Sequence, residues 1–96
     1  MRIFSKSTLR EYWEQNPRSE GALRRWHSYV ENAKWHTPAD VREYANSADF
    51  VGSKVIFNIG GNNYRLIADI DYEFGAVYIK FVGTHEEYDR IDVRTL

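Results

Sequence analysis

Three features are missing from this 96-residue chain, and each excludes a class of protein. It has no cysteine, so neither a disulfide framework nor a thiolate zinc site can form. No apolar run approaches the roughly 18 residues of a membrane span. No charge dominates, because 13 Lys and Arg face 14 Asp and Glu. We expect a soluble, cytoplasmic protein without membrane contacts, whose binding to nucleic acid depends on a local patch.

Aromatic residues, in contrast, are abundant and make up 16% of the chain. A chain of this length buries only about 60 to 65% of its extended surface, so its stability depends on dense apolar packing. Each buried ring removes about 150 to 250 Å² from water. We therefore predict a single domain over residues 1–96, and we expect Trp13, Trp26 and Trp35 to belong to its core rather than to stack on bases.

Helix signals fill the first half of the chain. Ser7-Thr8 with Glu11 resembles a capping box and predicts a short first helix, which Asn16-Pro17 ends before a second one begins. The second helix is amphipathic, because apolar residues recur at intervals of three and four. These residues are Ala22, Leu23, Trp26, Tyr29, Val30 and Ala33.

A third helix signal and the strand signals follow. Thr37-Pro38 with Asp40 predicts a short helix, and residues 46–53 read as a polar connection. Beyond them the pattern changes to alternation over residues 55–59, 64–70 and 77–82, and residues 2–5 can add an opening strand. Helices before strands predict an α+β fold, with N-terminal helices on one face of a small, mainly antiparallel sheet of about four strands.

The hairpin loop Gly60–Asn63 suggests how the strands pair. It sets Ile59 against Tyr64, Asn58 against Arg65, Ile56 against Ile67 and Lys54 against Asp69. A loop at residues 72–75 sets Asp69 against Tyr78, Ile67 against Lys80 and Arg65 against Val82. The expected core face then carries Val55, Phe57, Ile59, Tyr64, Leu66, Ala68, Ile70, Val77, Ile79 and Phe81, and Val82 falls on the other face.

That other face collects charged side chains. Lys54, Arg65 and Lys80 share it, and His85 and Tyr88 follow just beyond the last strand. Arginine can hold a phosphoryl group with its planar fork of donors, and histidine exchanges protons near neutral pH. The simpler interpretation is a Lys54–Asp69 ion pair among ordinary solvated charges.

Other candidate motifs favour structural roles. His27, His36 and His85 match no metal-ligand spacing, so no metal site is predicted. Gly60-Gly61 lies between strands and lacks the helix and lysine of a phosphate-binding loop. Arg24 and Arg25 on the second helix suit either a protein-contact surface or simple solvation.

Several segments together resemble the HigB-type toxins of the RelE superfamily. They run from Trp26 to Asp89, in the order Trp26, Ala33-Lys34-Trp35, Pro38-Ala39-Asp40, Val55-Ile56-Phe57-Asn58-Ile59-Gly60-Gly61-Asn62, Tyr64-Arg65-Leu66, Phe81-Val82-Gly83-Thr84-His85 and Glu87-Tyr88-Asp89. The resemblance implies the microbial RNase-like fold. It also implies a type II toxin that cleaves mRNA on the ribosome, is neutralised by a helix-turn-helix antitoxin and meets operator DNA only through that antitoxin.

The resemblance also implies roles for individual residues. Arg65 takes the place of the family's central arginine, and Lys54, His85 and Tyr88 join it as expected catalytic residues. Expected RNA contacts are Lys80, Asn58 and Asp89. The implied reaction needs no cofactor or metal and leaves 2′,3′-cyclic phosphate and 5′-hydroxyl ends. The chain departs from the better-known RelE pattern in its balanced charge and in having His85 where a second arginine stands.

Two non-enzymatic alternatives remain open at this point. The basic face could grip RNA or an acidic protein without cleaving it. The chain could also be a degenerate toxin that survives only as an antitoxin-bound corepressor. Cyclic-phosphate ends on mRNA would exclude the first, and growth inhibition by the chain alone would exclude the second.

Overall fold

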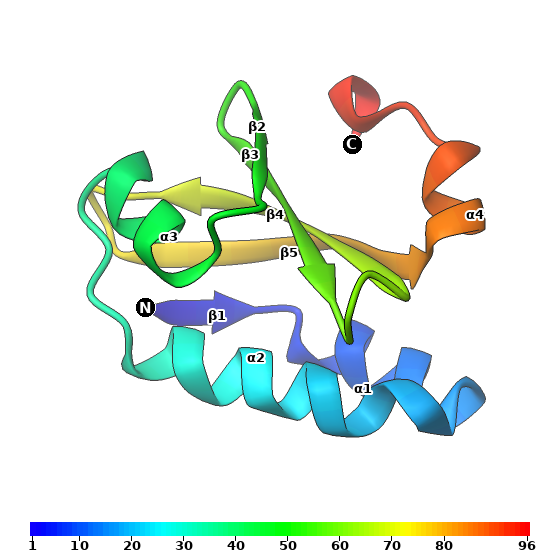
Figure 1. Cartoon of the computed structure of the whole chain (residues 1–96). Helices are drawn as coiled ribbons and strands as arrows, with labels where there is room; N and C mark the ends of the chain where they lie inside the picture. The colour runs from blue at the N-terminus through cyan, green and yellow to red at the C-terminus, as the bar shows by residue number, and fades with distance from the viewer.

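The computed structural model describes residues 1–96 and contains one five-stranded sheet in the order β1-β5-β4-β3-β2 (Figure 1). The pair β1–β5 is parallel and the other pairs are antiparallel. The sheet therefore has the expected, mainly antiparallel character and includes the opening strand. The strands are β1 (Arg2–Phe4), β2 (Asp49–Val51), β3 (Lys54–Ile59), β4 (Tyr64–Asp71) and β5 (Ala76–Thr84).

The helices confirm the α+β class. Figure 1 shows α1 and α2 lying together along one side of the sheet, with α4 at the end of β5 and the C-terminus beyond it. None of the helices is long and apolar enough to cross a bilayer. The helices are α1 (Lys6–Gln15), α2 (Glu20–Asn32), α3 (Pro38–Tyr44) and α4 (His85–Asp89), with 3₁₀ turns at Pro17–Ser19 and Val93–Thr95.

The strand β2 corrects the prediction that residues 46–53 form only a polar connection. Phe50 lies opposite Val55, packs against the core, and has the Arg42 guanidinium 4.4 Å from its ring centroid. One aromatic residue anchors this three-residue edge strand. A strand of only three residues is too short to give a detectable alternation in the sequence.

Only one of the two expected capping boxes forms. Thr37 and Asp40 cap α3 as predicted, each side chain accepting the other residue's backbone N–H. The box expected at Ser7-Thr8 is wrong, because α1 already begins at Lys6. Ser5 there takes a left-handed conformation (φ 72°), which turns the chain from β1 directly into the helix.

The core lies between the helices and one face of the sheet. All three tryptophans are buried, as predicted. Trp26 on α2 meets Phe57 on β3 edge-on at 5.5 Å between ring centroids, and Trp35 stacks on the same ring at 6.1 Å. Such aromatic pairs contribute about 0.5–1.5 kcal/mol each beyond their buried area, so Phe57 fixes α2 and the following loop against the sheet.

The β3–β4 hairpin has the predicted register throughout. Each of its predicted pairs is present, including Asn58 with Arg65 and Lys54 with Asp69. Gly60 and Gly61 have φ of +61° and +62°, which side chains with a Cβ avoid. This part of the sheet is therefore fixed by turn chemistry that is visible in the sequence.

The β4–β5 register differs from the prediction because of a bulge. Asp69 faces Tyr78 as expected, but Ala68 pairs with Ile79 and Ile67 with Phe81, which leaves Lys80 as an extra residue. The predicted pairs Ile67–Lys80 and Arg65–Val82 are therefore wrong. From this point the alternation is inverted, so Val82 joins the core, Phe81 leaves it, and Arg65 faces Gly83.

Candidate active site

Strand β4 and helix α4 bring Arg65 and His85 into contact, with 2.6 Å between Arg65 Nη2 and His85 Nε2. A guanidinium can only donate, so Nε2 must be the unprotonated acceptor. The imidazole proton is then on Nδ1, which faces Asp89 Oδ2 at 3.5 Å. The structure thus holds a neutral His85 in one tautomer, between a cation and a carboxylate.

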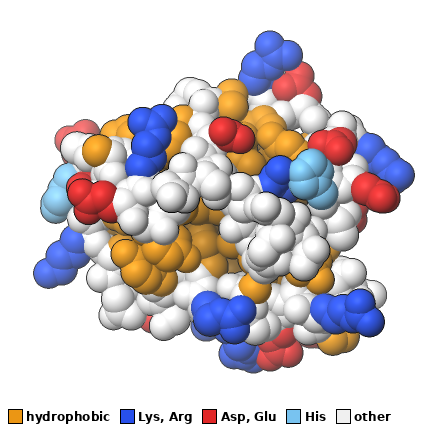
Figure 2. Space-filling model, viewed as in Figure 1, with side chains coloured by type: hydrophobic (Ala, Val, Ile, Leu, Met, Phe, Trp, Pro, Cys, Tyr) orange, Lys and Arg blue, Asp and Glu red, His pale blue; other side chains and the backbone are white.

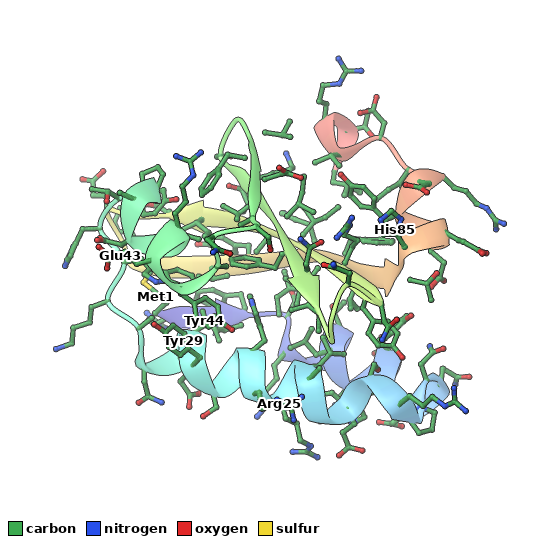
Figure 3. All side chains as sticks on the ribbon, in the orientation of Figure 1. Met1, Arg25, Tyr29, Glu43, Tyr44 and His85 are labelled. Atoms are coloured by element: carbon green, nitrogen blue, oxygen red, sulfur yellow. The ribbon has the colours of Figure 1, made fainter.

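One face of α4 supplies three of the predicted site residues. His85, Tyr88 and Asp89 stand at positions i, i+3 and i+4, which share a face of a helix. The Arg65 Cζ atom lies 5.6 Å from the centroid of the Tyr88 ring, so the aromatic side chain flanks the guanidinium. Figure 3 labels His85 beside α4, and Figure 2, viewed from the same side, shows a pale-blue histidine side chain against a blue one in this region.

The Arg65 side chain keeps one donor group unused. Its Nη1 atom is buried and has no hydrogen-bond partner in the protein. A buried donor without a partner is costly, and an anion that accepts from it removes that cost.

The residue opposite Arg65 on strand β5 is Gly83, where a Cβ would lie 2.6 Å from the Phe81 ring. Because Gly83 has no side chain, the Phe81 ring can occupy the space above it, on the strand next to Arg65.

Helix α4 is held at its start by a capping box that the sequence analysis missed. Glu87 Oε1 accepts the Thr84 N–H at 2.8 Å, and Thr84 Oγ1 accepts the Glu87 N–H. The bond from the Thr84 N–H is the main reason that the pKa of Glu87 is lowered. The Tyr12 hydroxyl donates to the same Glu87 oxygen, and burial followed by the charge of Glu87 raises the pKa of Tyr12. Thr84-x-x-Glu87 was the available sequence signal.

Lys54 is not brought to Arg65. It shares the face but pairs with Asp69, four strand positions from Arg65, which corresponds to about 13 Å at 3.3–3.4 Å per residue. No ion pair joins Lys54 to Asp69, so the simpler interpretation of these two residues as an ion pair is wrong.

Lys80 stands apart from the Arg65–His85 contact, whereas Asn58 is the cross-strand neighbour of Arg65 on β3. Lys80 is the extra residue of the bulge and is exposed. The Asn58 amide donates to the Ser47 carbonyl and hydroxyl oxygens at 3.3 and 3.0 Å, and so holds the segment before β2. The structure therefore gathers Arg65, His85, Tyr88 and Asp89 through side-chain contacts, places Asn58 beside Arg65 with its amide bound to Ser47, and leaves Lys54 and Lys80 farther away.

The second face of the sheet is less open than the alternation suggests. Ile56 and Ile67 lie on it but are only 3% and 0% exposed. Helix α4 packs on β4 and β5, and the chain beyond it returns toward the sheet (Figure 1). The accessible part of the site is thus confined to the neighbourhood of Arg65 and α4.

The remaining histidines lie elsewhere. His27 is half-buried on α2, and that burial lowers its pKa. His36 precedes α3, and its backbone N–H donates to Asp40 Oδ2 at 2.8 Å. No group of three or more His, Asp or Glu side chains is arranged to hold a metal ion.

Comparison with known proteins shows the family of the chain. Residues 19–91 match the family model HigB_toxin, described as the RelE-like toxic component of a toxin-antitoxin system. The chain is thus a RelE-like toxic component, and an antitoxin is its partner. Within this class it belongs to the HigB toxin family, which confirms the resemblance seen in the sequence.

The similar curated proteins share most of their length with this chain. An "mRNA interferase HigB" of Escherichia coli O6:H1 is 27% identical over 94 residues, covering 95% of this chain and 91% of that protein. The "mRNA interferase toxin HigB" of Escherichia coli K12 is 26% identical over 92 residues, covering 93% and 88%. An "mRNA interferase HigB" of Shigella flexneri gives the same values.

Proposed function

We propose that this protein is an mRNA interferase, an endoribonuclease that cleaves mRNA on the ribosome and thereby inhibits translation. Family membership and the names of its relatives support this activity. The observation that carries it is the contact between Arg65 and a neutral His85 oriented by Asp89. An anion-binding group and a proton acceptor therefore meet at one accessible point.

Arg65 is the proposed phosphate ligand. Its guanidinium can donate N–H groups to the oxygens of the scissile phosphate. Negative charge grows on these oxygens during the attack, so a fixed cation stabilises the transition state more than the ground state. The proposal assigns this charge compensation to Arg65 and requires no metal ion.

His85 is the proposed general base. When the phosphate engages Arg65, the lone pair of His85 Nε2 becomes free to accept the proton of the adjacent 2′-hydroxyl. Asp89 holds the other ring nitrogen in its protonated form and stabilises the imidazolium that results. The 2′-oxygen then bonds to phosphorus, the bond to the 5′-oxygen breaks, and that oxygen takes a proton, for which Tyr88 is the candidate donor. The products are 2′,3′-cyclic phosphate and 5′-hydroxyl ends.

The other predicted residues, Lys54, Lys80 and Asn58, are proposed to contact the RNA or to shape the surface on which it lies. Lys54 and Lys80 are proposed to contact flanking phosphates, since Lys54 lies too far along the sheet for the scissile one. Asn58 shapes this surface through Ser47. The balanced charge of the chain supports a requirement for the ribosome to present the mRNA, and the proposed reaction accordingly takes place in the cytoplasm. The proposed antitoxin is a helix-turn-helix protein that also carries the complex to operator DNA.

The test is to express wild type, Arg65→Ala and His85→Ala and to map the ends of cellular mRNA. We expect growth arrest and cyclic-phosphate ends with wild type, and a loss of cleavage of about 10²–10⁴-fold for His85→Ala. Arg94→Ala and His36→Ala are matched controls, because both residues are exposed and lie outside the site. Soluble Arg65→Ala and His85→Ala proteins that remain fully toxic would contradict the proposal.

Two further measurements test the setting of the reaction. Purified protein is incubated with mRNA alone and with mRNA on translating ribosomes, and cleavage only in the second reaction supports ribosome dependence. Co-expression with the product of the neighbouring gene tests the partner. Restored growth and a stable complex identify that product as the antitoxin, whereas continued arrest excludes it.

A further inference from the structure

A hollow of about 600 Å³ lies between the N-terminal end of α2 and the β3–β4 hairpin. The 3₁₀ turn before α2 and the first turns of that helix form one wall. The hairpin loop, the start of β4 and the end of β5 form the other. No Asp or Glu lines the hollow, and its cationic and polar residues are Arg18, Arg25, Asn63, Tyr64 and Thr84.

The two arginines at this hollow have no acidic partner. Neither Arg18 nor Arg25 takes part in an ion pair of the protein, and both are exposed. Their neighbour Arg24 differs, because it pairs with Glu20 at 2.6 Å and lies 4.6 Å over the Trp13 ring. Arg25 is labelled on α2 in Figure 3, and its Nη1 lies 3.4 Å from where a Cβ on Gly21 would stand. Two unpaired guanidinium groups thus border one cavity.

Glycine keeps the hairpin side of the hollow free of side chains. Gly60 has φ +61°, and a Cβ on it would stand 3.3 Å from the Tyr64 ring and 3.6 Å from Ala22 Cβ. The hairpin can therefore lie close to α2 while its loop still leaves space. A larger residue would strain the turn and crowd this wall.

The hollow adjoins the candidate active site along the chain. Tyr64 and Thr84 pair with each other across β4 and β5, and the next residues are Arg65 and His85. Because successive side chains of a strand point to opposite faces, the hollow and the Arg65–His85 contact lie on either side of the same end of the sheet. A strand of RNA bound at the Arg65–His85 contact can therefore continue around this end of the sheet and reach the hollow.

We propose that this hollow holds a second phosphate of the RNA strand whose scissile phosphate lies at Arg65. Guanidinium forks match phosphate oxygens, and a site without carboxylates imposes no repulsion. In a chain with net charge −1, RNA affinity has to come from such local groups. The inference rests on the proposed function, since its occupant is the same RNA strand.

The experiment measures binding of a fluorescent, single-stranded 2′-O-methyl RNA, which lacks the attacking hydroxyl and is not cleaved. Affinity is followed from about 50 mM to about 200 mM salt for wild type and for Arg18→Ala/Arg25→Ala. The loss of one phosphate contact lowers the salt slope by about 0.7 for a single strand, so wild type should lose about 2.6-fold more affinity over this range than the double variant. The single variants should each show about half the change in slope.

The control is Arg10→Ala/Arg24→Ala, which removes the same charge from two arginines that pair with glutamates one turn away. It should keep the wild-type slope, and unfolding curves should show both double variants folded. Equal slopes in the hollow and control variants would overturn the inference. So would an unchanged RNA slope accompanied by weaker antitoxin binding, which would make the hollow a protein contact. Because this RNA is not cleaved, failure of the proposed function appears separately, as cleavage that persists without Arg65 and His85.

Discussion

The Tyr12 hydroxyl donates a hydrogen bond of 3.2 Å to Glu87 Oε1, although 75 positions separate the two residues in the chain. The same carboxylate oxygen accepts the Thr84 N–H, so a single atom joins α1, the end of β5 and the start of α4. Helix α4 has only five residues and none of them is buried. Its position, and with it that of His85, therefore depends on this oxygen more than on apolar packing.

Replacing Tyr12 with Phe should loosen α4 without unfolding the protein. The change removes one partly exposed hydrogen bond, which is worth about 1 kcal/mol of unfolding free energy. We expect a larger relative loss of RNA cleavage, because His85 is no longer fixed beside Arg65. Tyr29→Phe is the control, since the Tyr29 hydroxyl makes no hydrogen bond within the protein and its ring stacks on Tyr44 at 3.8 Å. Urea unfolding and cleavage assays measure both effects, and equal results for the two variants would contradict the role of Tyr12.

Gly83→Ala should lower the stability of the protein, although alanine is usually more favourable than glycine within a strand. The new Cβ would stand 2.6 Å from the Phe81 ring and 3.1 Å from Glu87 Cβ, so the ring and α4 have to move. We expect a loss of about 1–3 kcal/mol, as for other overpacked sites. Gly21→Ala is the matched control and should stabilise α2 by about 0.5–1 kcal/mol, because its Cβ meets only the flexible end of Arg25. An unchanged melting temperature for Gly83→Ala would refute this account.

The hairpin that carries Arg65 could be predicted from sequence because its signals are local. Gly60-Gly61 fixes the turn, and alternation on both sides fixes the pairing of Asn58 with Arg65. The bulge at Lys80 could not be predicted in the same way. An extra residue in a strand changes no local propensity, and it only becomes evident when the partner strand is present. Because of the bulge, the residue opposite Arg65 is Gly83 and not Val82, which the alternation predicts.

Only part of the candidate site could be predicted, because some of its features depend on distances and contacts that are absent from the sequence. Arg65, His85, Tyr88 and Asp89 were identified from residue type and family resemblance, and α4 gathers them. Lys54 was placed with them because alternation assigns side chains to a face but gives no distance along it. The anchoring residue Tyr12 left no signal, because its bond to Glu87 joins distant parts of the chain.

Acid should weaken the attachment of α4 through Glu87. The pKa of Glu87 is lowered in the folded protein, chiefly by the Thr84 N–H bond and also by those from the Thr84 and Tyr12 hydroxyls. Its contribution to stability is therefore complete above the unfolded value near 4.3 and is lost as the pH falls through the lower folded value. Unfolding of wild type and Glu87→Gln, measured at pH 6 and at pH 3, should show a smaller drop in the variant. Equal drops would show that Glu87 is not involved.

Asp89→Asn should reduce cleavage less than His85→Ala does. The amide can still lie beside the imidazole, but it no longer stabilises a positive charge on it. An ion pair between exposed side chains is worth about 0.2–1 kcal/mol, which corresponds to a loss of rate of up to about fivefold. Asp92→Asn is the control, because Asp92 pairs with Arg94 outside the site. Single-turnover cleavage measures the rates, and a wild-type rate for Asp89→Asn would exclude Asp89 as an orienting group.

Lys54→Ala separates binding from chemistry on the sheet face. Since Lys54 lies about 13 Å from Arg65 along the strands, it can contact a flanking phosphate but not the scissile one. We expect its loss to raise KM several-fold and to leave kcat nearly unchanged, the pattern of an interaction that is equal in ground and transition states. Arg65→Ala should instead lower kcat, because its interaction strengthens as charge develops. A normal KM with a strongly reduced kcat for Lys54→Ala would contradict this prediction. It would show that Lys54 acts at the scissile phosphate, which would require the sheet to close around the RNA.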